Sequence, residues 1–315
     1  MISTSDLRKM LLPAYYYGTL LGRRFAMSLA ARRGLCPIAV LFYHRVADHT
    51  PNPWTVSHWD FERQVTWLAR HFEVISLAEA QCRMEKRASY RPAACLTFDD
   101  GYAENCERAL PWLCERKLPV TYFVASQFVL RGRPFPHDVE RGEPLPVNTV
   151  KELRWLASQG VEIGAHTRSH RDLGRVQDRD ELRDEIEGSR HDLQEAIGVP
   201  IRYFAFPYGQ RANLCRAAFE VASAAGFAGV CSAYGGYNAP GQDPFHVLRF
   251  HGDPDFLRFR NWLTWDPRLT RPSDWPAPRR GEPPWCGSPP AAEAIAPLVP
   301  RADSSPDPSS PRLAP

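Results

Sequence analysis

The sequence lacks several features that would assign it to a class at once. Its eight cysteines are scattered and none forms a Cys-x-x-Cys pair, so neither a zinc knuckle nor a disulfide framework is indicated. This cysteine usage suits a reducing compartment. The formal net charge is only +3, and no basic stripe with interleaved aromatic residues is present. We therefore expect no nucleic-acid partner.

Long apolar runs and a secretory leader are also missing. No small-residue cleavage site follows the first apolar residues, which predicts a cytoplasmic location. Residues 10–31 are apolar, but Arg23 and Arg24 interrupt them, so they do not make a spanning helix. This segment is expected to be a helix on the flank of the domain. The alternative is a peripheral contact with a membrane surface, at the inner face of the membrane.

The remainder of the sequence alternates between short apolar strands and helical patterns. With 315 residues and 43% apolar content the chain can bury a sizeable core. Seven or eight such alternations predict parallel β/α units, and both an open doubly wound sheet and a closed barrel fit. Strands are expected at 38–44, 74–75, 93–96, 119–124, 161–164, 203–206, 228–231 and 247–250. Helices are expected at 58–71, 77–87, 103–117, 149–158, 178–197, 211–225 and 255–264.

Three regions follow from this pattern. Residues 1–35 form an N-terminal helical segment, and residues 36–264 form the α/β domain, in which 131–148 are expected to be an exposed loop. Fourteen of the 30 prolines fall in the last fifty residues. Residues 265–315 are therefore expected to be a disordered Pro-rich tail without chemistry of its own.

Two adjacent carboxylates, Asp99 and Asp100, close the strand that begins at Ala93, and Gly101 follows them. Neighbouring side chains of a regular strand point to opposite faces. At the end of the strand, where Gly101 relaxes the backbone, both can enter one cleft, one to bind a cation and the other to take a proton. The alternative reading is an ordinary Asp-Asp-Gly turn.

Two imidazoles lie four residues apart just past another strand, at His166 and His170. This spacing puts them on one side of a helical turn or of a tight loop, where they can share a metal. Because the carboxyl ends of parallel strands meet, Asp100 can complete a set of two His and one Asp, which is typical of a catalytic zinc. Asp99 is then free to act as a base on a bound water.

Two further strand ends carry polar groups. Pro207-Tyr208-Gly209 fixes a turn whose backbone N–H can face an oxyanion, although an ordinary βα turn explains it equally well. His251 follows the last strand and can supply a proton to a leaving amine. His44, at the end of the first strand, is either a lining residue of the cleft or a structural one.

In order and placement, Thr97-Phe98-Asp99-Asp100-Gly101, His166-Thr-Arg-Ser-His170 and Phe206-Pro207-Tyr208-Gly209 resemble the motifs of the polysaccharide deacetylases. These are the enzymes with a NodB homology domain, carbohydrate esterase family 4. The resemblance covers about residues 36–264. It implies a distorted, TIM-like (β/α) barrel and metal-dependent removal of N- or O-acetyl groups from an acetylated glycan.

The resemblance also implies roles. Asp99 would be the general base, and Asp100, His166 and His170 would hold a divalent metal, usually Zn²⁺. Tyr208 would give its backbone N–H to the oxyanion, and His251 would be the acid.

The sequence also departs from the family pattern. Many members have an arginine before the Pro-Tyr-Gly turn that orients the catalytic aspartate, but Ala205 and Phe206 stand here. The Asp-Trp element that supports this arginine is not evident in 232–246. Arg202 or Arg249 is available as a substitute. Two alternative functions remain: a metal-dependent amidohydrolase on a small non-sugar amide, and a non-catalytic glycan-binding protein on the same fold.

Overall fold

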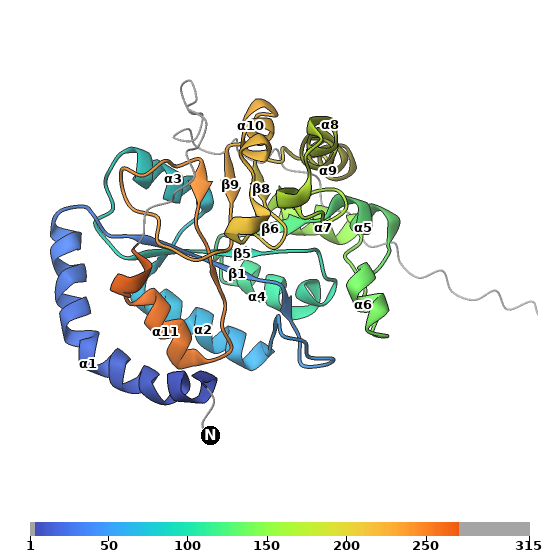
Figure 1. Cartoon of the computed structure of the whole chain (residues 1–315). Helices are drawn as coiled ribbons and strands as arrows, with labels where there is room; N and C mark the ends of the chain where they lie inside the picture. The colour runs from blue at the N-terminus through green and yellow to red at the C-terminus, as the bar shows by residue number, and fades with distance from the viewer. Residues whose placement is uncertain (1–3, 271–315) are drawn as a thin grey trace, which may run out of the picture.

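A parallel sheet forms the centre of the domain (Figure 1). The computed structural model describes residues 4–270, with side chains from residue 11 onward. The strands are β1 (Ile38–Tyr43), β4 (Glu73–Val74), β5 (Ala93–Phe98), β6 (Val120–Val124), β7 (Glu162–Ala165), β8 (Tyr203–Ala205), β9 (Gly229–Cys231), β10 (His246–Val247) and β11 (Phe250–His251). They run in the order β10-β9-β8-β7-β6-β5-β1-β11, with β4 paired to β5 off this path. Each of these pairings is parallel.

The two ends of this sheet belong to one continuous segment. β10 pairs with β9 at one end and β11 pairs with β1 at the other, and only Leu248 and Arg249 separate them. Asn238 completes the closure: its side chain bonds both backbone groups of Leu248, at 2.8 and 2.9 Å, and its backbone pairs with Ile38. The sheet is therefore curled into a distorted barrel. The single strand expected at 247–250 is wrong, since this segment divides into two short strands.

Helices surround the sheet, and most of the expected ones are present. They are α1 (Thr4–Arg32), α2 (His58–His71), α3 (Leu77–Glu85), α4 (Leu110–Glu115), α5 (Ser126–Arg131), α6 (Pro136–Glu140), α7 (Val150–Ser158), α8 (Arg179–Arg183), α9 (Ser189–Ile197), α10 (Arg216–Ala224) and α11 (Phe256–Leu263). Side chains of Ser57, Ser76 and Thr149 cap α2, α3 and α7 by accepting a backbone N–H of the first turn. A wide π-turn over Asn105–Ala109 precedes α4.

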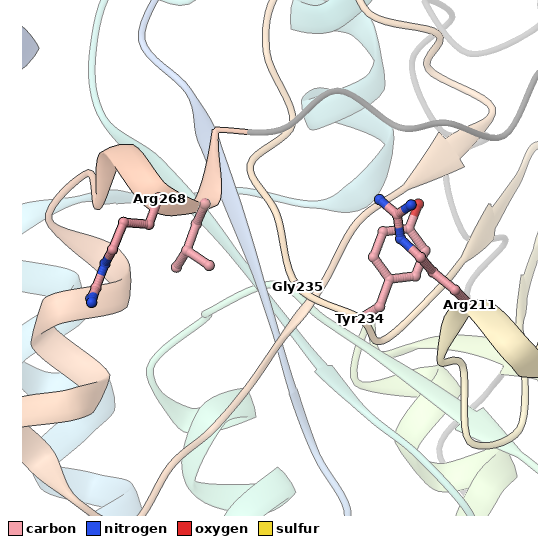
Figure 2. A pocket seen from close by; sticks show the side chains of 5 residues that line it. Arg211, Tyr234, Gly235 and Arg268 are labelled. Atoms are coloured by element: carbon pink, nitrogen blue, oxygen red, sulfur yellow. The ribbon is translucent and has the colours of Figure 1, made fainter. Parts of the chain in front are cut away.

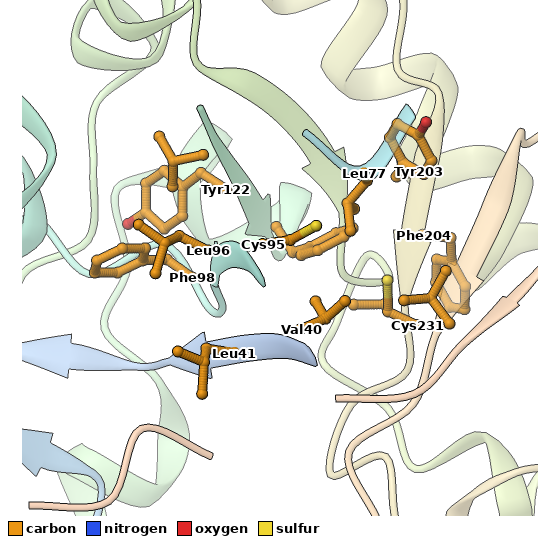
Figure 3. Close-up of a cluster of buried hydrophobic side chains, with 14 of the residues drawn as sticks. Val40, Leu41, Leu77, Cys95, Leu96, Phe98, Tyr122, Tyr203, Phe204 and Cys231 are labelled. Carbon is orange, nitrogen blue, oxygen red and sulfur yellow. The ribbon is translucent and has the colours of Figure 1, made fainter. Parts of the chain in front are cut away.

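The core lies between the sheet and these helices. All six residues of β1, all six of β5 and all five of β6 are buried, as expected for parallel strands covered on both faces. Figure 3 shows side chains from β1, β5, β8 and β9 gathered in this core, among them Val40, Leu96, Phe204 and Cys231. Its continuous apolar packing fixes the register of the strands, and so the positions of the residues at their carboxyl ends.

Residues 131–148 do not form the exposed loop that we expected. They contain α6, and Phe135, Leu145 and Val147 pack with Tyr102 in a second, smaller apolar cluster. The hydroxyl of Tyr102 also donates a 2.9 Å hydrogen bond to buried Asp138. The high Pro, Gly and charge content concealed these few anchoring residues.

The N-terminal helix and the end of the described chain pack against each other. Arg23 of α1 is buried and donates to the Asn261 carbonyl of α11 at 3.2 Å, and the Tyr15 hydroxyl donates to Asp266 at 3.0 Å. Asp266 is fully buried, although we assigned residues 265–270 to the Pro-rich tail. The rest of that region, 271–315, lies outside the described residues.

Candidate active site

The carboxyl ends of the strands bring the polar motifs together. Asp99 and Asp100 follow β5, and His166 and His170 follow β7. Only β6 separates β5 from β7 in the sheet, so these four residues lie close to one another. Each motif is thus carried to the same edge by the parallel pairing.

Asp100, His166 and His170 form a group that can hold a metal ion. Their ligand atoms all lie within 4.8 Å of one another. Asp100 Oδ1 is 3.4 Å from His166 Nε2 and 3.2 Å from His170 Nε2. Zinc bonds of about 2.0–2.1 Å in a tetrahedron put neighbouring ligand atoms about 3.3 Å apart, so the spacing fits such an ion.

The hydrogen bonding of His166 supports the same conclusion. Its Nδ1 lies 2.8 Å from the carbonyl oxygen of Ala205, which can only accept, so Nδ1 carries the proton. The other ring nitrogen, Nε2, faces Asp100 Oδ1 at 3.4 Å, and its lone pair is available to a metal when the ring is neutral. That oxygen is buried and makes no well-aligned hydrogen bond within residues 4–270. Two electron-pair donors that face each other repel unless a cation lies between them. These residues therefore fit a metal.

Electrostatics keep Asp100 ionised. Burial alone would raise the pKa of its carboxyl group, but the charge of His44, and the hydrogen bonds that His166 and His170 donate when no metal is bound and their rings carry a second proton, hold that pKa well below its usual value. A carboxylate is the form that binds a metal.

The loop that carries both histidines is held by two acidic residues that the sequence did not point to. Glu185, from the turn before α9, accepts the backbone N–H groups of Arg168 and Ser169 at 3.0 and 2.9 Å. Asp192 of α9 takes two hydrogen bonds from the Arg168 guanidinium, both at 2.8 Å. The segment is a tight loop, the second of the two geometries expected for this spacing, and these bonds fix its path.

Backbone strain is concentrated at the site. Asp100, Thr167, His170 and Tyr208 have φ angles of 77°, 61°, 58° and 59°, in the left-handed region that side chains other than glycine rarely adopt. Each such residue costs of the order of 1 kcal/mol or more, and persists only where the surroundings require it. Two of the four belong to the metal-ligand group, so the strain indicates that ligand direction is maintained at the expense of stability.

Asp99 is paired with Arg249. Arg249 Nη1 donates to Asp99 Oδ1 at 2.7 Å and Nη2 donates to Oδ2 at 2.9 Å, and Arg249 is fully buried. Burial alone would lower the pKa of Arg249, but the Asp99 carboxylate more than offsets this and raises it. Of the two arginines considered as substitutes at Ala205 and Phe206, Arg249 therefore contacts Asp99. Arg202 instead pairs with Glu162.

Three rings gather beside the carboxylates. His44 lies 5.1 Å from Trp54 and 5.7 Å from His251 between ring centroids, and Trp54 is 49% exposed. Burial lowers the pKa of His44, while Asp100 and Asp99 oppose the shift. His44 therefore lies beside Asp99 and Asp100. No pattern in the sequence pointed to Trp54, which lies on the Pro-containing loop before α2.

The loop of Trp54 is anchored. Buried Arg45 donates to the Thr50 carbonyl at 2.8 Å and to Thr55 Oγ1 at 3.1 Å, and pairs with Glu104 at 2.7 Å. Asn105 supports the adjoining backbone by donating to the His44 carbonyl at 2.7 Å. The exposed indole is thus held in place by buried polar contacts below it.

The turn after β8 places Tyr208 next to the histidines. Its ring lies 5.1 Å from that of His170. Within the described chain, no protein acceptor takes the backbone N–H of Tyr208. Gly209 follows with φ of 61°, and a Cβ there would lie 2.7 Å from that of Ala233. The turn therefore needs glycine at this position.

A separate cavity of about 330 Å³ lies away from this group. It is lined by Arg211, Tyr234, Gly235, Arg268 and Leu269. Figure 2 shows Arg268 pointing away from Tyr234 and Arg211. Arg268 is paired with Asp266. Because the cavity contains neither the carboxylates nor the histidines of the strand ends, we do not associate it with their chemistry.

Fold and site together define a class: a parallel β/α barrel with a histidine–carboxylate metal group and a second, arginine-bound carboxylate at its carboxyl edge. The family model for polysaccharide deacetylase matches residues 86–230. This range contains all three motifs, so the resemblance to the polysaccharide deacetylases that the motifs predicted is confirmed over residues 86–230.

Known proteins similar to this chain are consistent with the match to this family model. A chitooligosaccharide deacetylase of Sinorhizobium fredii is 29% identical over 119 residues, which is 38% of this chain and 47% of that protein. The chain thus spans about half the length of the curated relative it matches. The structure of IcaB from Ammonifex degensii has a TM-score of 0.61 at 24% identity, covering 73% of this chain and 98% of that one. A Streptococcus pyogenes deacetylase in complex with acetate has the same TM-score at 17% identity, with 73% and 99% covered. These structures confirm the fold.

Proposed function

We propose that this protein is a metal-dependent deacetylase that hydrolyses N-acetyl groups, and O-acetyl groups where present, on a polysaccharide or oligosaccharide. The observation that carries the proposal is the pairing of Asp99 with Arg249 at the strand end where Asp100, His166 and His170 converge. One carboxylate is held for proton transfer and the other for a metal.

Asp100, His166 and His170 would hold the metal, for which Zn²⁺ fits the ligand types. When bound, such an ion makes hydroxide available near neutral pH and polarises a carbonyl. The protein's own residues do the rest. Asp99 takes a proton from the attacking water, and Arg249 keeps the carboxylate in place. The backbone N–H of Tyr208 donates to the oxyanion of the acetyl carbon.

The leaving nitrogen needs the proton that the water gives up. His251 is the proposed donor, and its Nε2 is buried without a hydrogen-bond partner in the described residues. Burial lowers the pKa of His251 to about 3, and His44 adds to the shift while Asp99 opposes it. The imidazole is therefore neutral at pH 7, and we propose that it relays the proton from Asp99 to the amine. The products are acetate and a free amino sugar.

The exposed ring of Trp54 supports a sugar substrate. Its edge-on contact with His251, at 5.6 Å between centroids, puts a flat apolar surface next to the proposed acid. Pyranose rings present apolar C–H faces, which aromatic side chains in binding clefts cover. A small non-sugar amide would not need such a surface.

The test is acetate release from N-acetylglucosamine oligomers by the purified protein, with and without a chelator, together with bound-metal analysis. We expect about one metal per chain and chelator-sensitive acetate release. Asp99→Asn should keep the metal and lose about 10²–10⁴-fold in turnover, the usual contribution of a general base. Retained turnover in Asp99→Asn would contradict the role of the base.

The remaining outcomes point to the alternatives. Bound metal without acetate release would indicate a different amide substrate. If no metal binds even after zinc is added, the site is degenerate and the protein is a glycan-binding module.

A further inference from the structure

The outer face of α1 is apolar and basic, although its inner face is already packed. Buried Tyr16 and Arg23 attach the helix to the domain. On the opposite side Tyr17, Leu21 and Phe25 are 60%, 79% and 73% exposed, and they are spaced four residues apart. This spacing puts them on one side of the helix. In Figure 1, α1 forms the left and lower margin of the molecule, and the exposure of these three side chains shows that this face is turned outward.

The charges around this face are all of one sign. Arg24, Arg32 and Arg33 are exposed, and no acidic residue occurs anywhere in residues 7–47. On an α-helix with 100° per residue, Arg32 lies within the arc that Tyr17, Leu21 and Phe25 span, and Arg24 lies about 20° outside it, next to Tyr17. A surface that takes this face must therefore accept apolar side chains and carry negative charge.

We propose that α1 lies in the interface of an anionic membrane, with Leu21 and Phe25 inserted among the acyl chains and the arginines on lipid phosphates. Such interfacial helices combine large apolar side chains with basic residues and do not need the length of a spanning segment. No helix in the described part of the chain is long and apolar enough to cross a membrane. This inference does not depend on the proposed activity.

A second copy of the chain is the main competing occupant. Gly18 and Gly22 lie near the same face with open space around them, which would allow two helices to approach closely. However, pairing two copies would bring Arg24 and Arg32 against their own counterparts, with no acidic residue in residues 7–47 of either copy to offset the repulsion. Charge complementarity therefore favours the anionic lipid.

The experiment is co-sedimentation of the full chain with vesicles of phosphatidylcholine alone and of phosphatidylcholine with 30% phosphatidylglycerol. We expect binding to the mixed vesicles that is at least about tenfold stronger than to the neutral ones and that weakens at high salt. Leu21→Ser/Phe25→Ser and Arg24→Gln/Arg32→Gln should each lower the partition coefficient about tenfold or more.

Trp155→Ser is the matched control. Trp155 is 43% exposed on α7, away from α1, so its replacement should leave vesicle binding unchanged. Circular dichroism checks that each variant is folded, which we expect because the replaced side chains face outward. Light scattering without vesicles gives the oligomeric state.

Three results would overturn the proposal. They are wild-type binding that is equal for both vesicle types or absent, a Leu21→Ser/Phe25→Ser variant that binds as the wild type does, and a wild-type dimer that this variant converts to a monomer. The last result would identify a second copy as the occupant.

Discussion

Arg249 donates one hydrogen bond to each carboxylate oxygen of Asp99, although 150 positions separate the two residues in sequence. The fork geometry of a guanidinium fixes both the position and the plane of the carboxylate. Arg249 Nη1 also donates to Thr97 Oγ1 at 3.1 Å, and Nε donates to the Ser232 carbonyl at 3.0 Å. The arginine is thus itself fixed from β5 and from the end of β9.

Replacing Arg249 should reduce both stability and turnover. Arg249→Gln leaves the buried Asp99 charge without its partner, so we expect the free energy of unfolding to fall by about 3–5 kcal/mol. Denaturant unfolding of Arg249→Gln, Asp99→Asn and the double variant gives the coupling free energy between the two side chains. The double variant should recover part of the loss. A double variant whose loss is the sum of the two single losses would mean that the pair is not coupled.

Arg249→Lys separates orientation from charge. Lysine keeps the positive charge but cannot hold both carboxylate oxygens at once. We expect kcat for acetate release to fall about tenfold or more, with KM and bound metal unchanged, because misplacing a base affects proton transfer rather than binding. An unchanged kcat would show that charge alone is sufficient.

Removing one histidine of the metal group should remove the metal. His166→Ala deletes a ligand whose orientation the Ala205 carbonyl fixes, so we expect metal content below about a tenth per chain and loss of chelator-sensitive activity. His191→Ala is the control, since this side chain is exposed on α9 and 75% accessible. Equal metal content in His166→Ala and wild type would show that other residues hold the metal.

Trp54 should affect substrate binding more than chemistry. Trp54→Ala removes an apolar surface beside His251 and breaks no side-chain hydrogen bond within the described residues, while the Trp54 backbone bond to Asn52 remains. We expect KM for the oligomer to rise roughly tenfold at nearly constant kcat, the effect of losing about 1.4 kcal/mol of stacking. Trp59→Ala, on the outer side of α2, should leave both constants unchanged. A fall in kcat with constant KM would place Trp54 in the chemical step.

His246 should make the protein sensitive to acid. It is buried, its Nε2 lies 2.9 Å from Ser232 Oγ, and burial lowers its pKa to about 3. The unfolded chain binds a proton near pH 6.5 and the folded chain does not, so stability is full above pH 6.5 and falls as the pH drops toward 3. Between pH 7 and pH 5 this residue alone should cost about 2 kcal/mol. Denaturant unfolding at both pH values, with His246→Gln as the non-titrating comparison, measures the difference.

Much of the site was predictable because it is local in sequence. Asp99-Asp100 and the His166–His170 spacing each lie at one strand end, and the parallel order brings strand ends together. The Asp99–Arg249 contact was only one of two options, since no local pattern fixes which arginine reaches a carboxylate 150 residues away. No pattern in the sequence pointed to Glu185, because it supports the site indirectly, by accepting backbone N–H groups of the loop that carries the two histidines. Trp54 and Phe135 were hidden in segments whose composition resembles solvent-exposed loops.

The closure of the barrel has a consequence for synthesis of the protein. Residues 246–251 supply both terminal strands of the sheet and, between them, Arg249. After Asp99 has been added to the growing chain, the ribosome must add another 150 residues before Arg249, the partner of that carboxylate, exists. Until then β1 and β9 are unpaired edge strands of the sheet, and the Asp99 carboxylate has no ion-pair partner. Activity should therefore appear in one late step of synthesis, and a chain ended before Arg249 should expose the edges of β1 and β9 to chaperones or to other copies of itself.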